Sequence, residues 1–306
     1  MALPAIQPYP MPGRSAMPDN RVSWSPDPGR AALLIHDMQQ YFADAFVAGE
    51  SPLTELTANI RRLKTNCVEL GVPVIYTAQP GGQTPEQRAL LLDFWGPGLD
   101  DGPGRKRIVE PLAPDESDIV ITKWRYSAFR KTDLLDTLRE LGRDQLIVCG
   151  IYAHIGCLMT ACDAFMQDVQ PFFVGDAVAD FSRDYHEMAL TYAAERCAVV
   201  LTAEETADAL KRSPNAARHR RDGSISLRAL REQVAGLLYE TPSEIGDDDD
   251  LVDRGLDSVR IMSLAESWRR RGADITFAEL AERPTLGEWS KLLSSRMAGE
   301  TNECAT

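Results

Sequence analysis

The chain has 306 residues, of which 44% are hydrophobic and 26% charged, and its formal net charge is −13. This length suits one large domain with a small one. The acidic balance disfavours a nucleic-acid partner, because phosphate backbones bind basic surfaces. No apolar stretch approaches the roughly 20 residues of a membrane span, and the N-terminus does not resemble a secretory signal. We therefore expect a cytoplasmic protein with no membrane partner.

Cysteine and histidine are sparse and scattered. The six cysteines form no Cys-x-x-Cys pair, and the four histidines show no metal-ligand spacing with them. We expect reduced, mostly buried thiols and no metal site. Prolines at positions 4, 8, 10, 12 and 18 predict an extended N-terminal arm laid over the surface.

Residues 31 to 202 alternate between short apolar runs and helical periodicity. The runs predict strands at 31–35, 73–77, 118–123, 145–151, 171–174 and 198–202, and the periodic segments predict helices at 53–70, 132–141, 156–168 and 184–196. Continuous apolar runs are typical of strands buried on both faces of a parallel sheet. The pattern predicts an α/β fold with a doubly wound parallel sheet.

Polar residues follow several of these predicted strands: Asp37, Gln79, Lys123 and the segment 152–156. In open α/β sheets, ligands bind outside the carboxyl ends of the strands. Taken singly, Asp37 could merely cap the next helix and Lys123 could be a surface charge. Their joint position at strand ends favours a shared site.

A polar, basic stretch at 209–223 predicts a linker between a first domain at 1–208 and a second at 224–297. Beyond it, periodic apolar residues predict four helices, at 227–238, 258–271, 277–282 and 286–293. A small all-α four-helix domain is expected there.

The segment 255–259 (GLDSV) follows an acidic run at 247–250 and opens the second of these helices. Gly255 permits a tight turn, and Ser258 stands at the helix start. Its hydroxyl could simply cap free N–H groups, which is a common role for serine. The motif also resembles the site at which carrier proteins attach 4′-phosphopantetheine, with Ser258 as the attachment residue beside Asp257.

The segments 34–39 (LIHDMQ), 76–80 (YTAQP), 95–98 (WGPG), 123–129 (KWRYSAF) and 150–157 (GIYAHIGC) resemble those of isochorismatases. The whole chain resembles the bifunctional isochorismatase–aryl carrier proteins of catecholate siderophore synthesis. That resemblance implies an isochorismatase-like hydrolase followed by a carrier domain. It also implies that isochorismate is cleaved with water into 2,3-dihydro-2,3-dihydroxybenzoate and pyruvate.

The resemblance implies Asp37 as the general acid, with Lys123 as its partner, and substrate contacts from Gln79, Arg88, Trp95 and Tyr152. A vinyl ether resists water until its terminal carbon is protonated, so the acid is the demanding role. Burial would have to raise the pKa of Asp37, whereas Lys123 would favour the carboxylate. We therefore expect the proton to sit on Asp37 only once substrate carboxylates contact Lys123.

The wider superfamily contains thiol hydrolases whose nucleophilic cysteine precedes a helical aspartate by seven residues. Seven residues before Asp163 lies Gly156, so the resemblance implies no nucleophile and room there for substrate and water. Cys157 is then expected to be a buried neighbour. The alternative, an amidohydrolase that uses Cys157, stays open. The superfamily also implies a cis peptide at Ile151–Tyr152.

For the second domain, the resemblance implies that Ser258 carries 2,3-dihydroxybenzoate as a thioester on the phosphopantetheine arm. It implies three partners: a phosphopantetheinyl transferase, an aryl-adenylating ligase and the condensation domain of a peptide synthetase. Val259, Arg260 and Met262 are the expected docking face, although the apolar ones could be core. A carrier scaffold with an inactive hydrolase domain is a further alternative, and a homo-oligomer is expected only by analogy.

Overall fold

The computed structural model describes residues 3–216, 227–270 and 273–297. The chain divides into two compact units, Met1–Ala216 and Ala217–Thr306, which are described separately below. None of the helices in these described ranges is long and apolar enough to cross a membrane.

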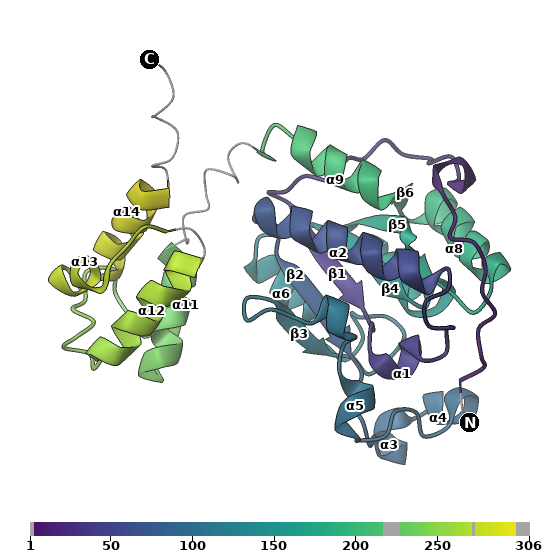
Figure 1. Ribbon diagram of the computed structural model, residues 1–306, viewed down its shortest axis with the longest axis horizontal. Coiled ribbons are helices and arrows are strands. Elements are labelled where there is room, and N and C mark those ends of the chain that lie inside the picture. Colours follow the sequence, from purple (N-terminus) through teal and green to yellow (C-terminus); the bar gives the residue numbers. More distant parts are fainter. Residues whose placement is uncertain (1–2, 217–226, 271–272, 298–306) are drawn as a thin grey trace. The chain divides into compact units, whose positions relative to one another are not determined.

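The first unit is built on a six-stranded parallel sheet with the order β3-β2-β1-β4-β5-β6 (Figure 1). The strands are β1 (Ala31–His36), β2 (Val74–Ala78), β3 (Ile119–Thr122), β4 (Gln145–Ile151), β5 (Gln170–Ala179) and β6 (Val199–Leu201). All five neighbouring pairs run parallel. This is the doubly wound arrangement, so the predicted fold class is confirmed.

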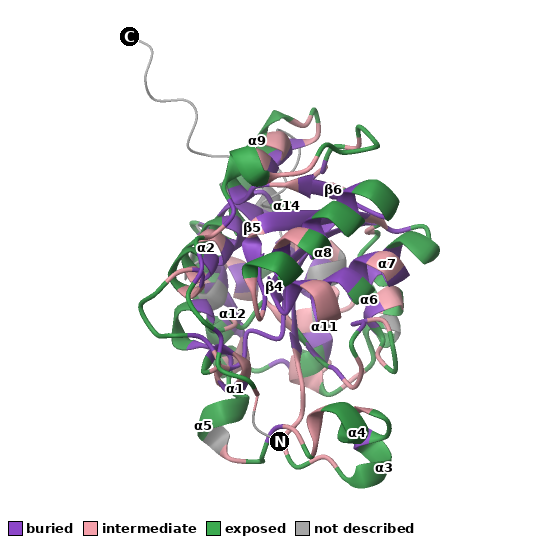
Figure 2. Ribbon diagram, turned by 90° about the vertical axis from the view of Figure 1, so that its right-hand side faces the viewer, coloured by how far each residue is buried: buried purple, intermediate pink, exposed green. Residues whose placement is uncertain are grey.

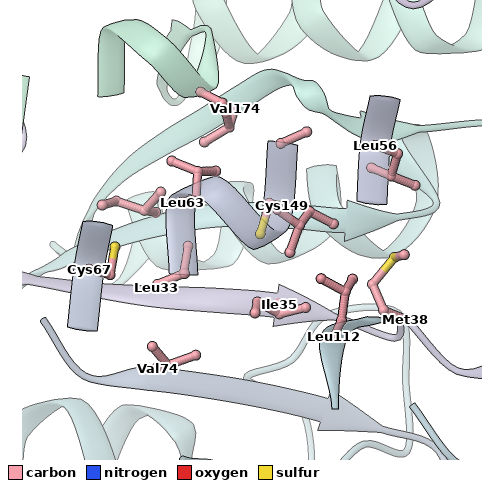
Figure 3. Packing of buried hydrophobic residues seen from close by; sticks show 14 of the residues in the cluster. Leu33, Ile35, Met38, Leu56, Leu63, Cys67, Val74, Leu112, Cys149 and Val174 are labelled. Atoms are coloured by element: carbon pink, nitrogen blue, oxygen red, sulfur yellow. The ribbon is translucent and has the colours of Figure 1, made fainter. Parts of the chain in front are cut away.

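Helices cover both faces of this sheet, because alternate residues of a buried strand point to opposite sides. On β1, Leu33 and Ile35 pack with α2 (Leu53–Glu69) and α9 (Ala203–Arg212), as Figure 3 shows for the α2 side. Ala32 and Leu34 pack instead with α6 (Leu134–Glu140), α7 (Leu158–Met166) and α8 (Arg183–Arg196). Apart from the edge strand β3, where only Ile121 is buried, the strands are accordingly almost fully buried between green, solvent-facing helix surfaces (Figure 2).

Short elements complete the unit. They are the 3₁₀ turns η1 (Arg14–Ala16) and η2 (Glu110–Leu112), a π-helical turn η3 (Ala153–Cys157), and the helices α1 (Gln40–Ala43), α3 (Pro85–Arg88), α4 (Leu91–Trp95) and α5 (Pro103–Lys106). The predicted helix at 156–168 therefore begins as this π turn, and α7 proper starts at Leu158.

The predicted linker begins too early. Helix α9 continues to Arg212, and Ser213 and Asn215 both donate hydrogen bonds to Asp27 (2.8 Å each). Ala216 is buried in the core of the first unit. Residues 209–216 thus pack on the sheet domain because α9 presents an apolar face, with Leu210 fully buried. The rest of the predicted linker, 217–223, lies outside the described residues.

The second unit contains α11 (Leu227–Leu238), the 3₁₀ turn η4 (Pro242–Glu244), α12 (Ser258–Arg270), α13 (Phe277–Glu282) and α14 (Leu286–Met297). Its core centres on Trp268 and Trp289, whose rings meet edge to face at 5.7 Å. Both indole N–H groups are satisfied, one by Gln233 Oε1 (3.0 Å) and one by Leu280 O (2.9 Å). These are the four predicted helices.

Candidate active site

The candidate site lies where the strand order reverses, between β1 and β4, which is where doubly wound sheets bind ligands. Four strands deliver residues to it: β1 is followed by Asp37, β2 by Gln79, β3 by Lys123, and β4 by the turn that includes Gly156. The structure brings all seven predicted catalytic and substrate-binding residues to one cavity: Asp37, Gln79, Arg88, Trp95, Lys123, Tyr152 and Gly156.

Asp37 makes several short polar contacts in the cavity. Its Oδ2 lies 2.9 Å from Lys123 Nζ and accepts a hydrogen bond from Gln79 Nε2 at 2.9 Å. Its Oδ1 accepts from Thr77 Oγ1 at 2.7 Å. The backbone φ of Asp37 is +47°, a left-handed conformation that costs energy in a non-glycine residue and is enriched at functional sites. The surroundings therefore hold this carboxylate in one orientation.

Two opposing effects act on the pKa of Asp37. Burial raises the pKa, because the carboxylate loses its hydration. The nearby ammonium of Lys123 and the hydrogen bonds from Gln79 and Thr77 lower it, and together they prevail, so the pKa of Asp37 lies below its ordinary value. In the ligand-free protein Asp37 is therefore a carboxylate, and it requires a change in its contacts before it can donate a proton.

His36 is a buried member of the site that the sequence analysis did not single out. Burial is the main reason that the pKa of His36 falls to about 4, so the ring is neutral near pH 7. Its Nδ1 lies 2.9 Å from Ile151 O and its Nε2 lies 3.3 Å from Tyr126 O. No feature of a single sequence predicts these contacts, because they depend on how the strand ends meet.

The position that a side chain on Gly156 would take is already filled. A Cβ on Gly156 would overlap the His36 ring, at 2.9 Å from Nε2 and 3.0 Å from Nδ1, so the imidazole fills the space beside the turn. Gly156 nevertheless lines the cavity, so the expectation that glycine leaves room there for substrate and water stays a prediction. Glycine is required at 156 because any larger residue would displace His36.

Arg88 supplies a buried cation to the cavity. Its Nε donates to Gly96 O (3.0 Å) and its Nη1 to Gln79 Oε1 (3.3 Å). Gly98, with φ +77°, allows this placement, because a Cβ there would lie 2.6 Å from the Arg88 Cζ. Arg88 forms no ion pair with a carboxylate of the described residues, so its charge is available to an anion.

Arg125 is a second cation that the sequence analysis did not name. It lines the same cavity, and its Nη1 donates to the backbone oxygens of Gln87 and Trp124 at 3.0 and 2.6 Å. Like Arg88, it has no carboxylate partner within the part of the chain that the structure describes. With Lys123, the cavity thus presents three cations against one carboxylate, Asp37.

Aromatic rings form one wall of the cavity. Phe181 stacks on Tyr152 at 4.1 Å and on Trp95 at 6.0 Å. Trp95 is half-buried rather than a core residue, and its Nε1 donates to the Tyr126 hydroxyl (2.7 Å). The Tyr152 hydroxyl donates to Phe42 O (2.8 Å), so it can only accept a hydrogen bond from a ligand. Such a wall suits the face of a flat ring.

Cys157 does not have the environment of a nucleophile. It is fully buried, and burial raises the pKa of its thiol well above the ordinary value. The peptide Ile151–Tyr152, which precedes this turn, is cis, as the superfamily resemblance implied. No group of three or more His, Cys, Asp or Glu side chains in the described residues is placed to hold a metal ion.

In the second unit, Ser258 is exposed at the first position of α12. The helix is capped by its neighbour, because Asp257 Oδ1 accepts from the Arg260 N–H at 2.9 Å. The Ser258 hydroxyl makes no hydrogen bond with any described residue, so it is not used as a cap. Val259 and Met262 are exposed, whereas Ile261, Leu264 and Trp268 are in the core. A free hydroxyl at an exposed helix start is suited to covalent modification.

A doubly wound parallel sheet with a buried acid–lysine pair at its switch point, followed by a small helical domain, defines the class of protein as a two-domain α/β enzyme. The isochorismatase domain model matches residues 31–205, and the phosphopantetheine attachment site model matches residues 228–293. The first match covers more than half of the chain. The chain therefore belongs to the isochorismatase family. The second match identifies a phosphopantetheine attachment domain.

Relatives share both parts of the chain. An isochorismatase of Bacillus subtilis is 61% identical over 301 residues, covering 97% of this chain and 96% of the relative. Enterobactin synthase component B of Escherichia coli is 49% identical over 294 residues, covering 96% and 99%. The crystal structure of a cysteine hydrolase from Pseudomonas syringae superposes with a TM-score of 0.56 at 24% identity, covering 63% of this chain and 97% of that one. The predicted family and its two-part organisation are confirmed.

Proposed function

We propose that this protein cleaves the vinyl ether of isochorismate and also carries an aryl acid on a phosphopantetheine arm attached to Ser258. The observation that supports the first activity best is the Asp37–Lys123 pair, at 2.9 Å, in a cavity with two guanidinium groups that have no carboxylate partner among the described residues. Isochorismate has two carboxylates and a ring, which match the cations and the aromatic wall. Family membership makes hydrolysis the expected reaction.

In the proposed mechanism, substrate binding first changes the ionic contacts of Lys123 and Asp37. Arg88 and Arg125 attract the substrate carboxylates. When one of these carboxylates approaches Lys123, the ammonium of Lys123 stabilises the carboxylate of Asp37 less strongly. The pKa of Asp37 then rises, because burial is no longer opposed, and the group takes up a proton. Asp37 transfers this proton to the methylene carbon of the vinyl ether, which forms a C–H bond and an oxocarbenium ion.

Water then adds to the cationic carbon and gives up a proton, which leaves a hemiketal. The bond between the hemiketal carbon and the ether oxygen then breaks. That oxygen stays on the ring and takes up a proton to become the alcohol, while the hemiketal hydroxyl loses its proton and becomes the carbonyl of pyruvate. Gln79 is suited to keep Asp37 aligned through both steps, since its amide bridges Asp37 Oδ2 and Arg88 Nη1. The aromatic wall of Trp95, Tyr152 and Phe181 would exclude bulk water from one side.

The decisive experiment is pyruvate release from isochorismate by the full chain and by Asp37→Ala. We expect release by the wild type and a loss of at least about a thousandfold in the variant, since general acid catalysis contributes up to 10⁴-fold. A folded wild-type protein that releases no pyruvate would leave a carrier scaffold with an inactive hydrolase domain. Release that iodoacetamide abolishes would instead point to a thiol in the reaction and favour a catalytic role for Cys157.

The carrier role rests on Ser258, which is exposed and leaves the capping of α12 to its neighbour Asp257. We place the hydrolase domain at 1–216 and the carrier domain at 224–297. A phosphopantetheinyl transferase would install the arm, an aryl-adenylating ligase would load 2,3-dihydroxybenzoate, and a condensation domain would receive it. Incubation with a transferase and coenzyme A should add one phosphopantetheine mass to the wild type and none to Ser258→Ala. Addition to both proteins would exclude Ser258.

A further inference from the structure

The N-terminal arm is built into the first unit and is more than a surface strand. Ile6 and Tyr9 are buried. The N–H of Ile6 donates to Ala45 O (2.8 Å), and that of Tyr9 to Ser51 O (3.2 Å). Residues 3–12 thus follow a defined path, and they reach the neighbourhood of α4 in both views of the molecule (Figures 1 and 2).

Tyr9 joins this arm to the backbone of the active-site wall. Its hydroxyl accepts from the Asp180 N–H (2.8 Å) and lies 3.2 Å from His186 Nδ1. Asp180 is fully buried, and its carboxylate accepts from the His154 N–H (2.6 Å) in the turn that contains Gly156. The next residue, Phe181, lines the cavity. The arm is therefore anchored where the aromatic wall and the active-site turn meet.

The arm also contributes a side chain to the cavity itself. Leu3 is half-buried and lines the same space as Asp37, together with Phe42 and Leu91. It offers an apolar contact in a cavity whose cations are Lys123, Arg88 and Arg125. An apolar residue at this position excludes water without neutralising those charges.

We propose that the N-terminal arm completes the substrate-binding cavity, and that Leu3 is a substrate-binding residue of the hydrolase reaction. This inference rests on the proposed function, because it takes the ligand to be a small dicarboxylate. Leu3 packs against the ligand and shields Asp37 from water, while Ile6 and Tyr9 hold the arm in place. The consequence is that charge placed at position 3 changes substrate binding according to its sign.

The test compares Leu3→Glu and Leu3→Lys with the matched controls Gln7→Glu and Gln7→Lys. Gln7 is exposed on the same arm and does not line the cavity. Leu3→Glu should raise KM for isochorismate by about fivefold or more, since like charges repel across a partly desolvated site, while Leu3→Lys should leave it unchanged or lower it. The Gln7 variants should match the wild type. Equal KM values for Leu3→Glu and Leu3→Lys would overturn the proposal.

Binding measured without turnover separates this inference from the proposed reaction. In an Asp37→Asn background, the Kd of isochorismate can be followed by tryptophan fluorescence, since Trp95 lines the cavity. Opposite shifts in Kd for the two Leu3 variants would support the role of the arm even if the wild type released no pyruvate. If the wild type released pyruvate while both Leu3 variants had identical Kd values, the proposed reaction would be supported and the role of the arm in substrate binding would be contradicted.

Discussion

The imidazole of His36 occupies the space that a side chain on Gly156 would need. A Cβ at position 156 would stand 2.9 Å from His36 Nε2 and 3.0 Å from Nδ1, which is closer than ordinary packing allows. Two residues far apart in the chain are thereby coupled: the histidine at the end of β1 is compatible only with glycine after β4. The same ring spans the carbonyls of Ile151 and Tyr126, so it joins the loops that carry Gly156 and Lys123.

Gly156→Ala should damage the active site and the fold together. The added methyl must displace a fully buried ring, and overpacking of this kind costs about 1–3 kcal/mol. We expect a lower Tm and a loss of pyruvate release. Gly104→Ala is the matched control, since a Cβ at Gly104 meets nothing within 4 Å. Unchanged activity and Tm in Gly156→Ala would show that His36 does not occupy this space in solution.

The same histidine makes stability depend on pH. The pKa of His36 is lowered to about 4, mainly by burial, from an ordinary value near 6.5. Between these values the unfolded chain binds a proton that the native protein does not, so the free energy of unfolding falls as the pH drops through this window. His36→Gln should reduce that slope by about 1.4 kcal/mol per pH unit. Urea unfolding from pH 4.5 to 6.5 measures it, and equal slopes would contradict the prediction.

Most of the fold could be predicted, because the parallel strands are continuous apolar runs with helical periods between them. The strand β5 was predicted too short, since Gly175 and Asp176 interrupt its apolar run. Helix α9 was missed, and its basic end was assigned to the linker. Its start carried a signal: Thr202 and Glu205 form a capping box. The helices α1 and α3 have only four residues each, too few for a period to show.

The candidate site could be predicted in part. Strand ends and motif resemblance placed Asp37, Lys123 and Gln79 together, and the structure brings them within hydrogen-bond distance. Thr77 and His36 were not predicted as site residues, although His36 adjoins Asp37 and Thr77 lies two residues before Gln79. Whether a residue next to a catalytic group faces the cavity depends on strand register and loop path, which only the folded chain fixes.

Arg88 should contribute mainly to substrate binding. It is a buried guanidinium without a carboxylate partner among the described residues, so a bound carboxylate would complete its charge pairing. Arg88→Met should raise KM for isochorismate by about tenfold or more, and Arg88→Lys should recover little, since lysine cannot reproduce the planar fork. Arg61→Met, at an exposed position of α2, serves as control. Steady-state kinetics would contradict the assignment if KM were unchanged in Arg88→Met.

The ion pair between Asp37 and Lys123 should be strongly coupled. Removing one partner leaves the other charge buried, which costs about 3–5 kcal/mol. Asp37→Asn and Lys123→Met should each destabilise the first unit, while the double variant should lose clearly less than the sum of the two. Chemical unfolding of the four proteins gives the coupling energy. Strict additivity would show that the pair, at 2.9 Å in the structure, is not formed in solution.

Substitutions at the adjacent residues Asp257 and Ser258 should have different effects, the first on the stability of the second unit and the second on attachment of the arm. Asp257 caps α12 through the Arg260 N–H, so Asp257→Ala should destabilise the second unit by about 0.5–2 kcal/mol. Asp257→Asn, which keeps a capping oxygen, should lose less. The Ser258 hydroxyl makes no hydrogen bond with a described residue, so Ser258→Ala should leave the stability of this unit unchanged while abolishing attachment of the arm. Thermal unfolding and intact mass after treatment with transferase and coenzyme A measure the two effects. A stability loss in Ser258→Ala as large as that in Asp257→Ala would mean that the serine hydroxyl is the helix cap.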